Sequence, residues 1–260
     1  MRKVLILFLA YPLTPASAEL RPATNQSWME YIRAANSRVR KESERKALWI
    51  DGEPGLRSRV RAGEIVASPT SGKSPVSIPN GLIHDWIGAV FIPNAALDDV
   101  VAVVQDYSRY AQYYGPTVRS STTVFNDGEQ ASFRVRYVQQ ALFVTVVFDA
   151  QYEVKFCHID DQRWYSVAHS TSIHQIRKDG PVERTLPADD KDGYVWRTYS
   201  NLKLEAADGG VYVEQQSIAL SPKIPVMLRW MVEPYVERLS RSLVMGWLSK
   251  TRSAVLAAAH

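Results

Sequence analysis

The sequence of 260 residues predicts an α+β fold: a curved antiparallel β-sheet wrapped around a long C-terminal α-helix, with an extra N-terminal helical segment. Three observations predict it. Apolar residues recur at helical spacing in residues 25–49, 96–114 and 234–257. A series of strand-like segments separated by turn residues occupies residues 118–220. An antiparallel sheet with one apolar face must bury that face, and the last helix is the only predicted element long enough to cover it.

The first eighteen residues have the three-part pattern of a secretory signal peptide. Arg2 and Lys3 precede the apolar run Val4–Ala10, and Ala16-Ser17-Ala18 has the small residues of a cleavage site. We therefore expect cleavage after Ala18 and export to the periplasm or the cell exterior. No later stretch is apolar for the roughly 20 residues that a membrane span needs, so no stable membrane insertion is expected.

Residues 19–80 are predicted to form an N-terminal helical extension and linker, and residues 81–260 the main domain. The first helix, 25–49, places Trp28, Tyr31 and Ile32 on one apolar face. Residues 51–80 carry many Gly, Pro and Ser residues and read as a winding connection with one short strand near 64–67.

The main domain is predicted to open with a strand at 83–91 and a helix at 96–114, which Gly115-Pro116 ends. The turn Asn126-Asp127-Gly128 then marks a hairpin. A short helix after Pro225 and a long one from Pro234 to about 257 complete the chain. The remaining predicted strands are 118–125, 131–138, 142–150, 152–159, 164–176, 194–205 and 211–220, with a polar loop at 177–192.

Composition excludes several classes of function. Lys and Arg number 31 and Asp and Glu 27, and removal of Arg2 and Lys3 leaves 29 against 27, an excess too small for a nucleic-acid surface. Cys157 is the only cysteine, so neither an intramolecular disulfide nor a cysteine-based metal site can form. The chain contains neither a Gly-x-Ser-x-Gly nor a His-Glu-x-x-His motif. We expect no catalytic residue, no metal and no cofactor.

Three sequence segments carry a resemblance to a known family. Gly88-Ala89-Val90-Phe91 leads into the helix at 96–114. That helix ends in Val104-Gln105-Asp106-Tyr107-Ser108-Arg109-Tyr110, and Tyr113-Tyr114-Gly115-Pro116 precedes the next strand. With the order of elements, residues 80–258 resemble the helix-grip proteins. This START-like, or SRPBCC, superfamily includes polyketide cyclases, coenzyme Q carriers and lipid-transfer domains.

The resemblance implies that an apolar small molecule, such as a lipid, a quinone or an aromatic polyketide-like compound, binds between the sheet and the C-terminal helix. Strand alternation is compatible with this, because it places Phe133, Val135 and Tyr137 on the inward face. The same residues could also fill a solid core. Gly246, inside the last helix, allows either close packing on the sheet or room for a ligand. The predicted ligand-binding residues are Phe133, Tyr137, Phe148, His169, Thr171, Trp196, Thr198, Leu243 and Trp247.

The first functional hypothesis is therefore an exported binding protein or carrier for a hydrophobic molecule, with no chemistry of its own. An alternative is a cyclase- or aromatase-like enzyme, in which a polar residue of the pocket polarises a polyketide-like substrate. The residues considered for that role are His169, Thr171, Arg197 and Tyr199. A third hypothesis is an interaction module that docks on a partner through exposed Trp28, Tyr31 and Ile32 on the first helix.

Overall fold

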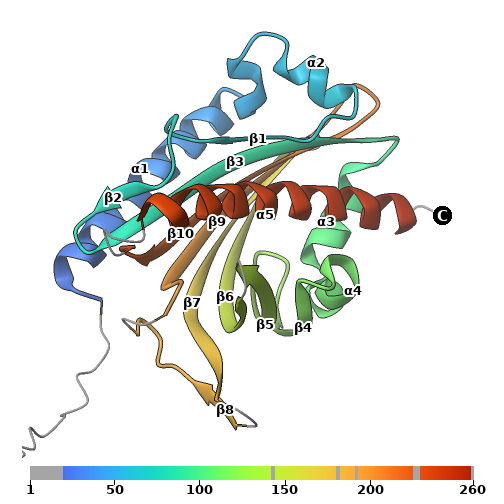
Figure 1. Cartoon of the computed structure of the whole chain (residues 1–260). Coiled ribbons are helices and arrows are strands. Elements are labelled where there is room, and N and C mark those ends of the chain that lie inside the picture. Colours follow the sequence, from blue (N-terminus) through green and yellow to red (C-terminus); the bar gives the residue numbers. More distant parts are fainter. Residues whose placement is uncertain (1–19, 142–143, 180–181, 191–192, 225–228, 259–260) are drawn as a thin grey trace, which may run out of the picture.

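The computed structural model describes residues 20–141, 144–179, 182–190, 193–224 and 229–258. The predicted signal peptide, residues 1–18, lies outside the described residues. One ten-stranded antiparallel sheet forms the framework, in the order β1-β3-β10-β9-β7-β6-β5-β4, with β2 also paired to β3 and β8 to β7. A long C-terminal helix, α5, crosses one face of this sheet, as Figure 1 shows. The predicted α+β, helix-grip architecture is confirmed.

The N-terminal helix and connection contain α1 (Pro22–Glu44), the 3-10 helix η1 (Trp49–Gly52) and α2 (Leu56–Arg61). The next strands and helices are β1 (Val66–Pro69), β2 (Val76–Ile78), β3 (Gly81–Pro93), α3 (Leu97–Gln105), η2 (Tyr107–Arg109) and α4 (Tyr110–Tyr114). The rest are β4 (Val118–Asn126), β5 (Gln130–Ala141), β6 (Val144–Asp160), β7 (Arg163–Asp179), β8 (Val182–Thr185), β9 (Arg197–Ala207), β10 (Gly210–Pro222) and α5 (Arg229–Ala258).

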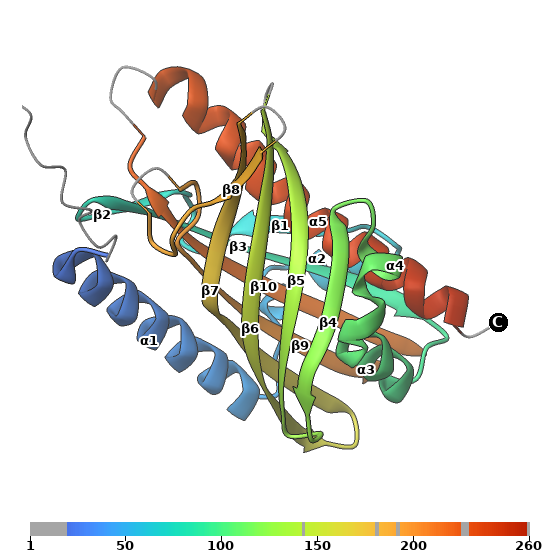
Figure 2. The same ribbon diagram turned by 90° about the horizontal axis from the view of Figure 1, so that it is seen from below.

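The sheet has two covered faces, which we call the inner face (toward α5, α3 and α4) and the outer face (toward α1, η1 and α2). Helix α5 packs on β3, β1 and β10 and on α3 and α4. Seen from below, α1 runs along the other side of the sheet (Figure 2). Because both faces of β3 are covered, every residue of Gly81–Ile92 is buried. This explains why residues 86–92 read as a continuous apolar run rather than as an alternating pattern.

The apolar stripe of α1 lies on the protein's own sheet. Trp28 and Ile32 are only 6% and 7% exposed, and they pack with Ile83 and Ile218 of the outer face. The hydroxyl of Tyr31 donates to Asp85 Oδ2 over 2.9 Å. The expectation that this stripe forms an exposed docking surface is therefore wrong.

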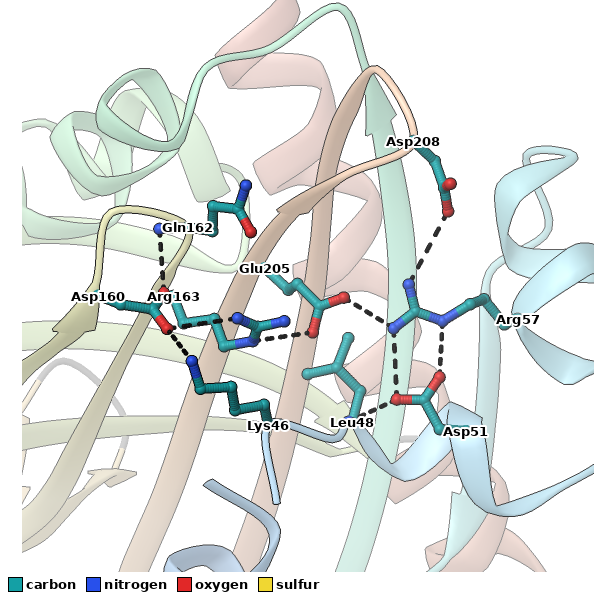
Figure 3. A network of polar contacts seen from close by, with 9 residues as sticks. All are labelled: Lys46, Leu48, Asp51, Arg57, Asp160, Gln162, Arg163, Glu205 and Asp208. Atoms are coloured by element: carbon teal, nitrogen blue, oxygen red, sulfur yellow. Dashed lines mark hydrogen bonds and ion pairs between the residues drawn. The ribbon is translucent and has the colours of Figure 1, made fainter. Parts of the chain in front are cut away.

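A network of charged side chains fixes η1 and α2 to the outer face. Glu205 on β9 accepts a hydrogen bond from Arg57 Nη2 at 2.8 Å and lies 3.4 Å from Arg163 Nε (Figure 3). Arg57 also donates to Asp51 at 2.6 Å, and Asp160 pairs with Lys46 at 3.1 Å. The pKa of the Asp51 carboxyl is held below its usual value despite burial, because Arg57 and the backbone of Leu48 donate to it.

Two predicted helices have different bounds in the structure. The predicted helix at 96–114 is interrupted at Asp106, whose backbone leaves the helical conformation with ψ 68°. The predicted break at Pro234 does not occur, because α5 continues through that residue. The predicted strands 142–150 and 152–159 are one continuous strand, β6, over the residues described.

Candidate functional site

A row of inward-facing residues crosses the middle of the sheet; we call it the inner-face row. It consists of Tyr152 (β6), Ala168 (β7), Ser200 (β9), Ser217 (β10) and Trp86 (β3). Strand register places them side by side, because Ala168 pairs with Ser200, Ser200 with Ser217, and Ser217 with Trp86. Tyr152 pairs with Ser170, the next inward residue of β7. Two large aromatic side chains thus flank a floor of alanine and serine.

The small residues of this row keep accessible surface although they lie in the centre of the sheet. Along β10, inward Val211 and Val213 are fully buried, whereas Gln215 and Ser217 are half-buried. On β9, Leu202 and Leu204 are buried, and Ser200 is half-buried. The described side chains opposite the row therefore do not fill the space above it. Since packed interiors leave few gaps, this partial exposure distinguishes the row from the closed core around it.

Helix α5 packs tightly only in its C-terminal half. Val244, Leu248 and Val255 are 3%, 0% and 1% exposed, and the ring of Trp247 stacks on Tyr114 of α4 at 5.6 Å. In the N-terminal half, Val236 and Leu239 are half-buried and Leu243 is 37% exposed. The Tyr235 hydroxyl donates to the carbonyl of Gln140 at the end of β5, 3.0 Å away. The helix is thus held at Tyr235 and along its C-terminal half, whereas Val236, Leu239 and Leu243 between these contacts are not fully buried.

Two glycines show where the helix touches the sheet. A Cβ at Gly88 of β3 would lie 2.8 Å from Val244 Cγ1 and 2.9 Å from Leu248 Cδ1, so this glycine permits the close approach of α5. A Cβ at Gly246 would meet nothing within 4 Å. Of the two alternatives considered for Gly246, close packing on the sheet is therefore wrong.

Hydroxyl groups surround the Tyr152 end of the row. Thr198 Oγ1 donates to Tyr152 Oη at 3.0 Å, and the Tyr137 hydroxyl is hydrogen-bonded to the same phenol. Ser170 Oγ accepts the Thr198 backbone N–H at 2.9 Å. Burial raises the pKa of Tyr137 well above its ordinary value and raises that of Tyr152 as well. Both phenols are therefore neutral at physiological pH and act as hydrogen-bonding groups rather than bases.

The β3 end of the inner face contains buried polar atoms that have no hydrogen-bond partner among the described residues. They are Trp86 Nε1, Gln215 Oε1 and His84 Nδ1, all on inward-facing side chains. His84 Nε2 lies 2.9 Å from Ser221 Oγ, and burial lowers the pKa of this histidine to about 4, so the ring is neutral. Unpaired buried polar atoms cost free energy, which a ligand that offers a partner could recover.

Several predicted ligand-binding residues lie on or beside the inner face. Tyr137, Thr198 and Trp247 are half-buried there, and Leu243, in the N-terminal half of α5, is 37% exposed. Phe133 and Phe148 also face inward, but they belong to the closed core. Phe133 is covered by the stacked ring of Tyr107 at 4.2 Å. Their role in ligand binding stays a prediction.

Three predicted residues do not face inward. His169 is exposed and pairs with Glu153 of the next strand at 3.4 Å, and Thr171 is also exposed. The reason is a β-bulge, since Gln151 pairs with Ser172 and Tyr152 with Ser170, which leaves Thr171 unpaired. Trp196 precedes β9 and packs with α1 on the outer face. The inward orientation expected for these residues is wrong.

The four residues considered for the enzyme alternative do not converge. His169 and Thr171 are exposed, whereas Tyr199 lies under α1, where its hydroxyl donates to Asn36 Oδ1 at 2.5 Å. Arg197 is bound by Asp189, with Nη2 2.5 Å from Oδ2. Within the described ranges, no group of three His, Cys, Asp or Glu residues could hold a metal ion. Within the same ranges, no helix is long and apolar enough to cross a membrane.

A separate groove of about 510 Å³ lies between α3 and the ends of β6 and β7. Val101, Phe156 and Trp164 supply its apolar surface, and Lys155 and His158 its basic groups. It is partly open to solvent and lined by side chains of both charge signs, since Asp98 and Glu129 also contribute. Apolar molecules prefer enclosed apolar surfaces, so this groove suits them less well than the inner-face row.

Searches of known proteins return structural similarities only. No family model and no curated protein matches the sequence. A STAR-related lipid transfer protein fragment from Xanthomonas axonopodis is 18% identical, covers 70% of this chain and 96% of its own, and has a TM-score of 0.48. Human STARD10 is 10% identical. The match covers 78% of this chain and 77% of STARD10, with a TM-score of 0.45. The Zhui aromatase/cyclase from Streptomyces sp. R1128 is 13% identical. The match covers 68% of this chain and 98% of the Zhui chain, with a TM-score of 0.41. At this level of similarity, function has to be inferred from the chain's own residues.

Proposed function

We propose that the protein binds an apolar small molecule on the inner-face row, beneath the N-terminal half of α5. The observation that carries this proposal is the half-buried floor of Ala168, Ser200 and Ser217 in the middle of an otherwise closed sheet. Aromatic side chains at both ends and half-buried Val236 and Leu239 above supply apolar surface of the kind that lines small-molecule sites.

Binding without chemistry is the function that these residues support best. The polar groups at the row are neutral phenols, hydroxyls, an indole and a neutral imidazole. Ser221 lies 2.9 Å from His84 on the inner face, but burial lowers the pKa of this histidine to about 4, which makes it a weak base, and the Ser221 hydroxyl donates to the carbonyl of Pro222. A carrier is thus favoured over the cyclase-like alternative.

Export is part of the same proposal. Cleavage after Ala18 would leave Glu19 as the first residue, three residues before α1 begins at Pro22. The intact mass of the protein recovered from the periplasm or medium tests this. The mass of a chain that begins at Glu19 would support export with cleavage. The mass of the full-length chain, found in the cytoplasm, would contradict it.

Filling the floor should abolish binding. In Ser200→Leu and Ser217→Leu, the larger side chains occupy the space above the row. We expect at least a tenfold weaker affinity for a pyrene-labelled alkane, measured by fluorescence titration of the purified protein. Circular dichroism establishes that each variant is folded.

Thr122→Leu is the matched control, because Thr122 is exposed on the edge strand β4. It should bind the alkane like the wild type. Unchanged binding by both serine variants, or no binding by the wild type, would overturn the proposed site.

A further inference from the structure

We propose that the ligand is an uncharged molecule carrying an acceptor oxygen, such as a ketone or an ester, and that this oxygen binds the hydroxyl of Tyr152. This rests on the proposed function and specifies which apolar molecules the same site takes.

The hydrogen-bond pattern leaves the Tyr152 proton available. The phenol oxygen accepts from Thr198 Oγ1 at 3.0 Å. The Tyr137 hydroxyl is the other polar group beside this oxygen and can donate to it. A phenol oxygen that accepts two hydrogen bonds still has its own O–H to donate. With Tyr137 as the donor, no hydrogen bond among the described residues uses the Tyr152 proton, which is then free for a ligand.

A second donor without a partner lies at the other end of the row. Trp86 is 4% exposed, and its Nε1–H, which can only donate, has no acceptor among the described residues. Both ends of the row therefore offer donors to acceptor atoms of a ligand.

The inner face also lacks a charge that could balance an ionic ligand. Near the row, the described inward residues of β3, β10, β9, β7, β6 and β5 are uncharged, and His84 is neutral; Arg177, which follows Gln175 on the inward side, is exposed at the far end of β7. The charged pair nearest in sequence to Tyr137 and Tyr152, Arg136 with Asp149 at 2.6 Å, is on the outer face. On the described turns of α5 above the row, Glu237, Arg238 and Arg241 are exposed. A carboxylate seated at Tyr152 would be desolvated without a counter-ion, which is strongly unfavourable.

Three probes with the same pyrene-labelled chain test this inference. One ends in a methyl group, one in a methyl ketone and one in a carboxylate. For the wild type at pH 7.5 we expect the ketone to bind about fivefold more tightly than the alkane, the gain of one neutral hydrogen bond. The carboxylate should bind at least tenfold more weakly than the ketone.

Tyr152→Phe removes the donor and keeps the ring. It should abolish the preference for the ketone and leave the affinity for the alkane unchanged. Tyr165→Phe, on the outward side of β7, is the matched control and should keep the preference.

The outcomes separate this inference from the proposed function. Failure of the alkane to bind contradicts the site itself. An alkane that binds as tightly as the ketone, a carboxylate that binds best, or a ketone preference that survives in Tyr152→Phe contradicts only the inference on ligand class.

Discussion

Replacing Lys203 with methionine is expected to lower the free energy of unfolding by about 3–5 kcal/mol at pH 8. Lys203 is 8% exposed on the outer face and pairs with Glu42 and, at 3.3 Å, with Glu214. The Glu214 side chain is 2% exposed, and its other oxygen accepts the Trp49 N–H at 2.6 Å. Without Lys203, a buried carboxylate would remain beside Glu42 with no cation in contact. Urea unfolding measures the loss, and Lys155→Met, at an exposed site, should change stability by less than about 0.5 kcal/mol.

The effect should depend on pH in a definite direction. Burial raises the pKa of Glu214 from 4.5 to about 7, with Lys203 opposing and Glu42 reinforcing the shift. The folded state therefore binds more protons than the unfolded state between these values. Stability from this group is lost as pH rises through that window, by on the order of 3 kcal/mol. At pH 5, where Glu214 is protonated, Lys203→Met should cost only about 1 kcal/mol.

Glu214→Gln isolates this titration. Relative to the wild type, its free energy of unfolding should increase by about 3 kcal/mol from pH 5 to pH 8. His84, whose pKa is lowered to about 4, acts in the opposite direction below pH 6.5, but it is present in both proteins and cancels in the difference. A difference that does not vary with pH would contradict the assignment of a near-neutral pKa to Glu214.

Gly88→Ala should destabilise the protein by about 1–3 kcal/mol, because the helix and the sheet are too close for a methyl group. The added Cβ would lie 2.7 Å from the carbonyl of Val66 as well as against Val244 and Leu248. Since a backbone atom is among these contacts, the strain cannot be relieved by turning a side chain. Thermal or urea unfolding gives the change.

Gly246→Ala, in the helix that packs against Gly88, is the control. Alanine is favoured over glycine in a helix interior, and here the methyl group meets nothing within 4 Å. We expect a gain of about 0.5–1 kcal/mol. Loss of stability in Gly246→Ala, or none in Gly88→Ala, would contradict the close approach of α5 to the sheet at Gly88 and the open space at Gly246.

The order of elements could be predicted from the sequence because each element has a local signal. The turn at Asn126-Asp127-Gly128, the apolar stripe of α3 and the length of the last helix were sufficient for the α+β architecture and for most strands. The second covered face was harder to predict. Lys203, Glu205 and Glu214 read as solvent-facing positions, and only the tertiary placement of α1, η1 and α2 buries them.

The site could be predicted only in part, because it depends on strand register. Tyr137 and Thr198 follow from alternation. The bulge at Thr171 reverses the alternation of β7, so His169 turns outward and Ala168 inward. Ser200 and Ser217 carry no chemical signal of their own. They form a floor because register brings them side by side, and no pattern along one strand shows this.

Anomalous diffraction from a crystal of the protein with a long-chain ketone, brominated along its chain, tests the central claim most directly. The account predicts bromine density above Ser200 and Ser217, with the ketone oxygen within hydrogen-bonding distance of Tyr152. Bromine density in the groove beside Val101 and His158, or a crystal in which α5 side chains fill the floor and exclude the ketone, would contradict it.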